Sequence, residues 1–239
     1  MRTIKIMIAA IAVITLNSCA FDINIGQENG NGNVVTEERN VREFDKVKGS
    51  AGLDVYITKG SENKVVVEAD ENLMMFIETE VSNGRLSIST KRSIGRSKAK
   101  KVHVTYVDLS EIAASSGADV IVNSVIKNES ITLDASSGAD LEVEVFAKDL
   151  YVETSSGADI KVRGKATRLK AKSSSGSEID AEELLVISCD ADASSGGDIT
   201  VNVKEELETE ATSGGTIRYY GNPSAVSKNG GRSGSVRKM

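Results

Sequence analysis

A short motif that recurs along the chain constrains the fold more than any other feature. SSGAD occurs three times, and SSGSE, SSGGD and TSGGT follow it at a similar spacing. Successive motif glycines are separated by 21, 19, 19, 20 and 18 residues. Self-similarity at such a period indicates stacked supersecondary units. The glycines are Gly117, Gly138, Gly157, Gly176, Gly196 and Gly214.

Apolar and polar residues alternate on both sides of each glycine. The third residue after the glycine is aliphatic in every copy, and its two neighbours in the chain are mostly polar. A period of two places apolar side chains on one face of a β-strand. The aliphatic set is Val120, Leu141, Ile160, Ile179, Ile199 and Ile217.

A unit this short cannot bury its apolar face alone, so consecutive units must stack. Equivalent strands then lie about 4.8 Å apart, and connections between parallel strands are right-handed. The sequence therefore predicts an all-β, right-handed parallel β-helix, or solenoid, with coils of about 20 residues that are regular over about 109–239.

The segment before residue 109 predicts irregular N-terminal coils that shield the open edge of the first regular coil. SAGLDVYI around Gly52 is a further copy of the motif, and ENLMMFIE is compatible with a helical turn. NGRLSIS at Gly84 fits either another copy or a hairpin turn, since Asn-Gly is a strong hairpin signal.

The motif also predicts the structure of the coil corner. Glycine supplies a backbone conformation that other residues resist. Continuing the alternation through the corner places the second motif serine inside, where a column of hydroxyls could exchange hydrogen bonds. Cys189 falls in a column of Ile131 and three leucines, so we expect it to be buried and unreactive. The inward serines are Ser116, Ser137, Ser156, Ser175 and Ser195.

The first residues predict export and a lipid anchor. Two basic residues precede an apolar run, Ile6–Leu16, that is too short to span a bilayer. LNSC resembles the lipobox of bacterial lipoproteins, although Asn17 is off-consensus, and a plain secretory signal with a chance cysteine is the alternative. We expect a signal peptide at 1–18, a lipid on Cys19 with a flexible tether over 19–40, and one β-helix domain over 41–239.

Charge narrows the class of partner. Removing residues 1–18 would leave 27 Lys and Arg against 35 Asp and Glu. Nucleic acid is not expected as a partner, because binding its phosphate backbone needs a basic face. A cationic or metal-bridged partner stays compatible with this charge.

The lipobox, the tether, the SSGAD corners and a closing YYGNPSAV segment together resemble the head GIN domain family of putative auto-transporter adhesins. The resemblance covers about Val41–Met239. It implies a β-helical fold and an adhesin role in a Gram-negative lipoprotein. It carries no catalytic residue over to this chain.

An acidic residue stands two positions after five of the motif glycines. One interpretation is a solvated corner residue that hydrogen-bonds to local backbone, which we favour. The other is a calcium site or a groove for glycans, although calcium-binding repeats carry acidic residues more densely. The acidic column is Asp119, Asp140, Asp159, Glu178 and Asp198.

No enzyme motif accompanies this column. Some parallel β-helices cleave polysaccharides, but an active site should interrupt the repeat at one coil, whereas the acids follow it through five. His103 is expected on a strand surface. We therefore expect a non-enzymatic outer-membrane lipoprotein, surface-exposed or facing the periplasm, that uses no cofactor and binds a glycan, matrix or envelope partner. A polysaccharide-active enzyme and a purely structural envelope protein are the alternatives.

Overall fold

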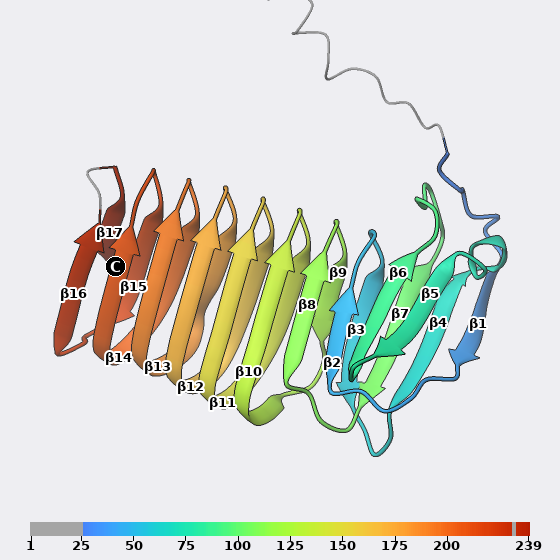
Figure 1. The fold of residues 1–239 in the computed structure, drawn as a ribbon, viewed down its shortest axis with the longest axis horizontal. Helices are drawn as coiled ribbons and strands as arrows, with labels where there is room; N and C mark the ends of the chain where they lie inside the picture. Colours follow the sequence, from blue (N-terminus) through green and yellow to red (C-terminus); the bar gives the residue numbers. More distant parts are fainter. Residues whose placement is uncertain (1–25, 231–232) are drawn as a thin grey trace, which may run out of the picture.

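Parallel strands stacked coil upon coil form the regular part of the molecule (Figure 1). The computed structural model describes residues 26–230 and 233–239. The predicted all-β solenoid is confirmed, with coils of about 19 residues; its right-handed winding stays a prediction. The regular strands are β8 (Glu111–Ser115), β9 (Asp119–Val122), β10 (Ile126–Ser136), β11 (Asp140–Ser155), β12 (Asp159–Ser174), β13 (Glu178–Ser194), β14 (Asp198–Ala211), β15 (Thr216–Gly221), β16 (Ala225–Gly230) and β17 (Ser235–Lys238).

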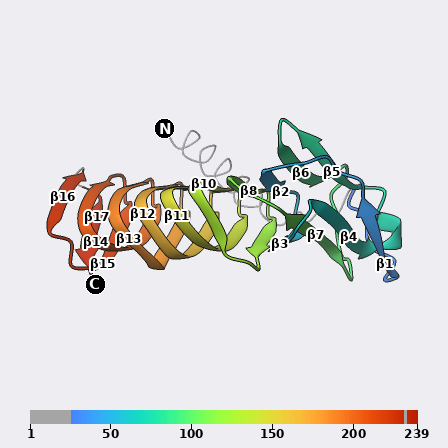
Figure 2. The same ribbon diagram turned by 90° about the horizontal axis from the view of Figure 1, so that it is seen from below.

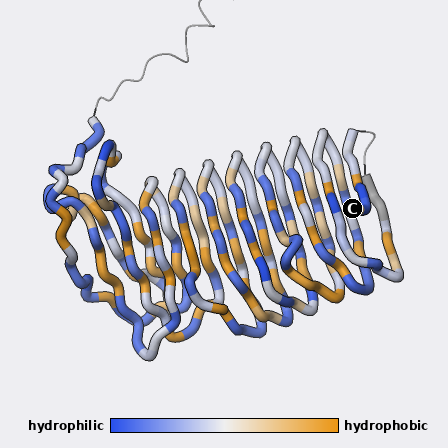
Figure 3. Tube along the Cα trace, turned by 180° about the vertical axis from the view of Figure 1, so that it is seen from behind, coloured by the Kyte–Doolittle hydropathy of each residue, from blue (hydrophilic) through white to orange (hydrophobic). Residues whose placement is uncertain are grey.

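In-register pairing turns the repeat into continuous core columns. Ile160 pairs with Leu141 on one side and Ile179 on the other, and each is at most 2% exposed. Cys189 pairs with Leu169 and Leu207 in a second column and is buried, as predicted. Burial also raises the pKa of its thiol, which disfavours the reactive thiolate. Figure 3 shows the alternation of apolar and polar residues along each coil.

Each corner is a tight turn with two left-handed residues. Ser116 has φ 54° and Gly117 has φ 71°, and the Ala118 N–H donates to the Ser115 carbonyl at 3.3 Å. A type I′ turn requires positive φ at both central positions. Along the stack, each corner glycine N–H donates to a serine carbonyl of the adjacent coil at 3.0 to 3.2 Å. The hydrogen-bonded ladder thus continues through the corners.

The prediction that the second motif serine faces inward is wrong. The two central residues of each turn point to solvent, so alternation stops before them and resumes at the buried residue after the glycine. The buried hydroxyls are elsewhere: Ser177 Oγ donates to Thr154 Oγ1 at 3.0 Å, and Ser173 Oγ donates to the Ser177 carbonyl at 2.8 Å. The exposed serines are Ser116, Ser137, Ser156, Ser175 and Ser195.

The N-terminal coils are stacked out of sequence order. The coil formed by β2 and β3 lies between the coil formed by β6 and β7 and the coil formed by β8 and β9. Its Gly52 N–H donates to the Ser116 carbonyl at 3.0 Å, so the predicted corner at Gly52 is confirmed. Asn83 and Gly84 instead connect two antiparallel strands, so they form the hairpin and not another copy. These elements are β2 (Lys46–Gly49), β3 (Asp54–Lys59), β5 (Ile77–Ser82), β6 (Arg85–Thr90) and β7 (Lys100–Tyr106).

Antiparallel strands close the N-terminal end. β1 (Val34–Arg39) pairs with β4 (Lys64–Asp70), which pairs with β7, and the predicted helical turn is the short 3-10 helix η1 (Glu71–Leu73). Figure 2 shows the β5–β6 hairpin to one side of β1 and β4. Because β1 lies within 19–40, the prediction of a flexible tether is wrong for this stretch. All strands of the described chain lie between Val34 and Lys238.

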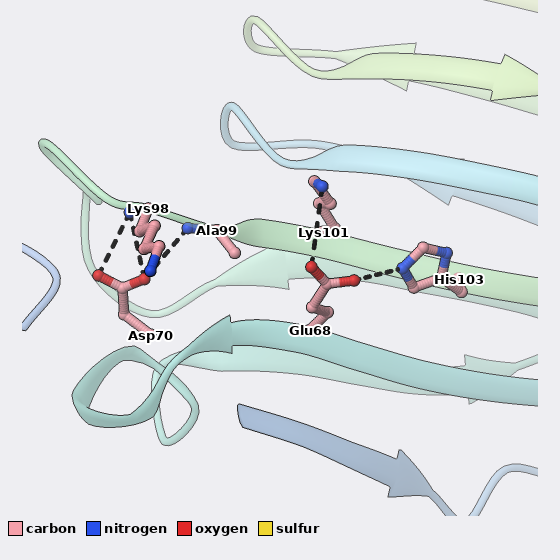
Figure 4. A network of polar contacts seen from close by, with 6 residues as sticks. All are labelled: Glu68, Asp70, Lys98, Ala99, Lys101 and His103. Atoms are coloured by element: carbon pink, nitrogen blue, oxygen red, sulfur yellow. Dashed lines mark hydrogen bonds and ion pairs between the residues drawn. The ribbon is translucent and has the colours of Figure 1, made fainter. Parts of the chain in front are cut away.

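A buried carboxylate holds this cap together (Figure 4). Asp70 accepts hydrogen bonds from the backbone N–H groups of Gly32, Lys98 and Ala99. Burial alone would raise the pKa of Asp70, but these three donors favour the anion and the net pKa is lowered. Gly30 passes so close that an added Cβ would overlap the carboxylate. Asp70 therefore joins the N-terminal segment to the loop before β7.

Replacing Ile160 with Asn should destabilise the solenoid far more than replacing its neighbour Lys161 with Asn. Ile160 is 1% exposed, and an unpaired buried amide costs about 2 to 7 kcal/mol. Lys161 points outward and would lose only a surface ion pair with Asp180, worth about 0 to 1 kcal/mol. Urea unfolding of both variants measures the difference, and equal losses would contradict the assignment of faces.

Candidate binding faces

The predicted acidic column is a continuous ladder on the face that follows each corner. Its five members are paired neighbours in adjacent coils. The structure adds Asp54, which pairs with Asp119. Asp54 also stands two positions after a motif glycine, but 65 residues separate it from Asp119. The sequence motif could have identified Asp54 as a member, whereas its position in the stack depends on the unexpected coil order.

Repulsion along this ladder changes how readily its carboxylates ionise. Partial burial, followed by repulsion from Asp119 and Asp159, raises the pKa of Asp140. Partial burial, followed by repulsion from Asp159 and Asp198, raises the pKa of Glu178. The Asp140 and Glu178 carboxylates are therefore protonated more readily than free carboxylates.

A basic side chain stands at each end of the ladder. Lys100 Nζ lies 3.8 Å from Asp54, and Arg218 Nη1 lies 3.8 Å from Asp198. Partial burial still raises the pKa of Asp54, although Lys100 opposes it. The basic groups thus offset repulsion at the ends and leave it uncompensated in the middle.

The expected hydrogen bonds between corner acids and local backbone are not formed. Within the described chain, no backbone N–H donates to the carboxylates of Asp119, Asp140 or Asp159. No group of three or more His, Cys, Asp or Glu residues in the described ranges has an arrangement that could hold a metal ion. Calcium takes six to eight oxygen ligands, and one outward carboxylate per coil provides no enclosing shell for it.

A different arrangement lies on the face that precedes each corner. A hollow of about 300 Å³ crosses several coils here, and the Tyr151 ring at its edge is 47% exposed. Arg168 pairs with Asp149 at 2.5 Å, and Lys170 pairs with Asp190 at 3.5 Å. We call this the Tyr151 groove. It is lined by Asp149, Leu150, Tyr151, Arg168, Leu169, Lys170, Ser188, Cys189, Asp190, Glu206 and Glu208.

Several polar side chains of the groove have no hydrogen-bond or ion-pair partner within the described chain. The Tyr151 hydroxyl has no hydrogen-bond partner in the described chain, and Glu206 and Glu208 have no basic partner there. An exposed aromatic face beside carboxylates and ion pairs can stack on one side of a ligand and hydrogen-bond to its edge. No sequence pattern marks this groove, because its polar side chains occupy ordinary outward positions of the repeat.

His103 lies on a strand surface, as predicted (Figure 4). Its ring stacks on Tyr56 with centroids 5.6 Å apart, and Nε2 lies 3.1 Å from a Glu68 oxygen. Glu68 also pairs with Lys101 at 3.7 Å. The imidazole is therefore part of a surface network between β4 and β7.

The predicted anchor at Cys19 and the signal peptide at 1–18 lie outside the described residues. Among the residues that are described, no helix has the length and apolar character needed to cross a bilayer.

Neutralising two ladder residues should preserve or raise stability at neutral pH. In Asp140→Asn with Glu178→Gln, two acids with raised folded pKa are removed. Such acids bind more protons in the folded state, so wild-type stability falls as pH rises from about 4 through the raised values. The advantage of the variant should therefore grow over this window, as measured by urea unfolding at several pH values.

Glu142→Gln with Glu144→Gln is the matched control, because both of these outward acids pair with Arg163. That variant should gain no stability. A structural calcium ion would give a different result: millimolar calcium would raise the melting temperature of the wild type but not of the ladder variant. This outcome would replace the interpretation of a repulsive ladder by a metal site.

Comparison with known proteins agrees with this architecture. A putative adhesin of Bacteroides fragilis NCTC 9343 superposes with a TM-score of 0.82 at 20% identity, covering 89% of this chain and all of the other. A putative lipid binding protein of Parabacteroides distasonis ATCC 8503 gives 0.69 at 22% identity, covering 89% and 99%. A putative adhesin of Parabacteroides merdae ATCC 43184 gives 0.60 at 20% identity, covering 90% and 99%. At these identities the likeness establishes the fold alone.

No curated protein is significantly similar to this chain in sequence. The sequence model of the family described as "Putative auto-transporter adhesin, head GIN domain" matches residues 43–223. The match covers most of the chain, and it agrees with the resemblance carried by the SSGAD corners and the YYGNPSAV segment. The chain therefore belongs to the head GIN domain family of putative auto-transporter adhesins.

Proposed function

We propose that this protein is a non-enzymatic, lipid-anchored binding module of the outer membrane that holds a glycan in the Tyr151 groove. The adhesin description of its family supports a binding role. The observation that carries the proposal is the composition of the groove: an exposed tyrosine ring beside acidic and basic side chains held in ion pairs.

Glycan chemistry fits these groups better than a purely apolar ligand would. A sugar ring offers a C–H face that packs on an aromatic ring, and its hydroxyls both donate and accept hydrogen bonds. Glu206 and Glu208 can accept from such hydroxyls, and Arg168 can donate to them. The ion pairs of Arg168 and Lys170 fix their side chains before a ligand arrives, which lowers the entropy lost on binding.

The in-register pairing of the strands that line the groove favours an extended ligand. Positions 151, 170, 190 and 208 are paired neighbours on four successive coils. A linear chain lying across the coils would meet a new set of side chains about every 4.8 Å. The enzymatic alternative requires an acid and a base positioned to react with a bound sugar, whereas Arg168 and Lys170 are held in ion pairs with Asp149 and Asp190.

Replacing Tyr151 with Ala should weaken glycan binding by about tenfold or more, since an aromatic contact and its buried area are lost. The measurement is a glycan array probed with residues 26–239, followed by calorimetry on the best ligand. Tyr220→Ala, on the other face, is the matched control and should bind like the wild type.

A chain that binds no glycan, or a Tyr151 variant that binds as well as the wild type, would contradict the proposal. Release of new reducing ends from the bound glycan would instead support the polysaccharide-active alternative. Failure to bind any glycan, matrix component or envelope protein would favour the purely structural one.

Replacing Cys19 with Ala should move the protein from the membrane fraction to the soluble fraction. The reason is that LNSC supplies the acceptor for acyl chains, and two chains anchor a protein stably. Fractionation of cells that express each form measures the change. A replacement of Ser18 by Thr retains the cysteine and should leave the protein in the membrane; unchanged fractionation of the Cys19 variant would rule out the anchor.

A further inference from the structure

The bends opposite the Ser-Gly corners carry an apolar patch that the groove does not explain. These bends form the lower edge of the solenoid in Figure 1. Phe146, Leu185 and Ile187 lie here, 39%, 43% and 39% exposed. In most of the regular coils outward positions carry polar residues, but β13 presents both of these aliphatic residues to solvent. They border a hollow of about 670 Å³.

Lysines surround this patch. Lys127, Phe146 and Lys165 are paired neighbours in successive coils, and Leu185 is the next member of the same column. Basic and apolar side chains thus alternate along the edge. Lys127 Nζ lies 5.8 Å from the centroid of the Phe146 ring. We call the set Phe146, Leu185, Ile187, Lys127, Lys148, Lys165 and Lys204 the lysine-rimmed patch.

The charge of the patch is opposite to that of the chain. The whole chain has a formal net charge of −6, whereas the lining of this hollow contains four lysines and one acid, Glu129. Lys127, Lys148 and Lys165 have no carboxylate within 4 Å in the described chain, and Lys204 pairs with Glu205 at 3.6 Å. Three ammonium groups are thus available to an anionic partner.

We propose that the lysine-rimmed patch docks the solenoid on an anionic lipid surface. Phe146, Leu185 and Ile187 have no polar atom in their side chains, so they suit acyl chains better than sugar hydroxyls. Lysine stems can lie along apolar surface while their ammonium groups reach phosphates. Each lysine near an anionic membrane contributes about fivefold to binding.

The shape of this edge also fits a flat surface. The coils stack in a straight row, so successive bends lie along one line (Figure 1). An apolar side chain from each of two coils can then enter the interface while the flanking lysines contact headgroups. An anionic membrane would repel the acidic remainder of the protein surface, so the protein should bind with this edge facing the membrane. The inference does not depend on the Tyr151 groove.

Vesicle binding by residues 26–239 tests the proposal without a contribution from the N-terminal lipid. Vesicles of phosphatidylcholine with an equal part of phosphatidylglycerol should bind the protein at least tenfold more tightly than phosphatidylcholine alone. Lys148→Gln with Lys165→Gln should lower that affinity by roughly tenfold or more. Lys161→Gln with Lys172→Gln removes the same charge from outward positions outside both the patch and the groove and should have little effect.

The absence of tryptophan from the chain provides a second readout. Phe146→Trp would carry the only indole, and its emission should shift to the blue when anionic vesicles are added. Tyr56→Trp, on β3 and outside the lysine-rimmed patch, should not shift. Unchanged melting temperatures would show that both proteins keep the fold.

Any one of four results would overturn the proposal. One is equal binding to neutral and anionic vesicles, and another is an equal loss in the two lysine pairs, which would indicate net charge alone. The third is patch-dependent binding of soluble poly-glutamate without vesicle binding, which would assign the patch to an acidic peptide. The fourth is a wild-type protein that binds glycan but does not bind anionic vesicles, which would refute this inference and leave the proposed function standing.

Discussion

The hydrogen-bonded register between coils is the constraint on which every other feature depends. Because pairing continues through the corners, each coil fixes the position of the next, and the core columns follow from that alignment. The turn makes this continuity feasible: two left-handed residues reverse the chain over a very short distance, so the strands on both sides stay in register. Glycine fits the second left-handed position without strain, whereas serine at the first has a steric cost. The stacked hydrogen bonds offset that cost at each corner.

The same register also transmits unfavourable interactions along the stack. A buried isoleucine repeated in every coil gains contacts on both sides, but an acid repeated in every coil gains a repulsive neighbour on both sides. The acidic ladder is the surface counterpart of the core columns. Partial burial raises the pKa of Asp140 and of Glu178, and repulsion from the neighbouring acids of the ladder raises both further. Lys100 and Arg218 offset the repulsion only at the ends, because within the repeat no basic residue enters that column.

Sequence reasoning predicted the positions that repeat within the strands, and it failed at the corner turns and where the repeat is interrupted. Periodicity located the corner glycines, the aliphatic columns and the burial of Cys189, since each depends only on position within a coil. It misplaced Ser116, because strand alternation was extended through a turn that does not follow it. Periodicity could not give the stacking order of the N-terminal coils. Asp54 lies beside Asp119 because the coil of β2 and β3 is stacked directly against the coil of β8 and β9, although β4 to β7 lie between them in the sequence. Asp70, the centre of the cap, belongs to no repeat, so no sequence pattern identified it as a structural residue.

The two proposed binding surfaces follow from this same distinction. A perfectly repeated outward position yields a uniform column, which can repel or attract but cannot be selective for a particular ligand. Selectivity requires outward positions that differ between coils. Tyr151 is followed in its column by a lysine, an aspartate and a glutamate, and Phe146 lies between two lysines. Both surfaces occupy the middle coils, where stacking on each side holds the backbone in place. A rigid repetitive core with variable outward residues therefore presents two distinct surfaces, the lysine-rimmed patch along one edge and the Tyr151 groove on a separate face.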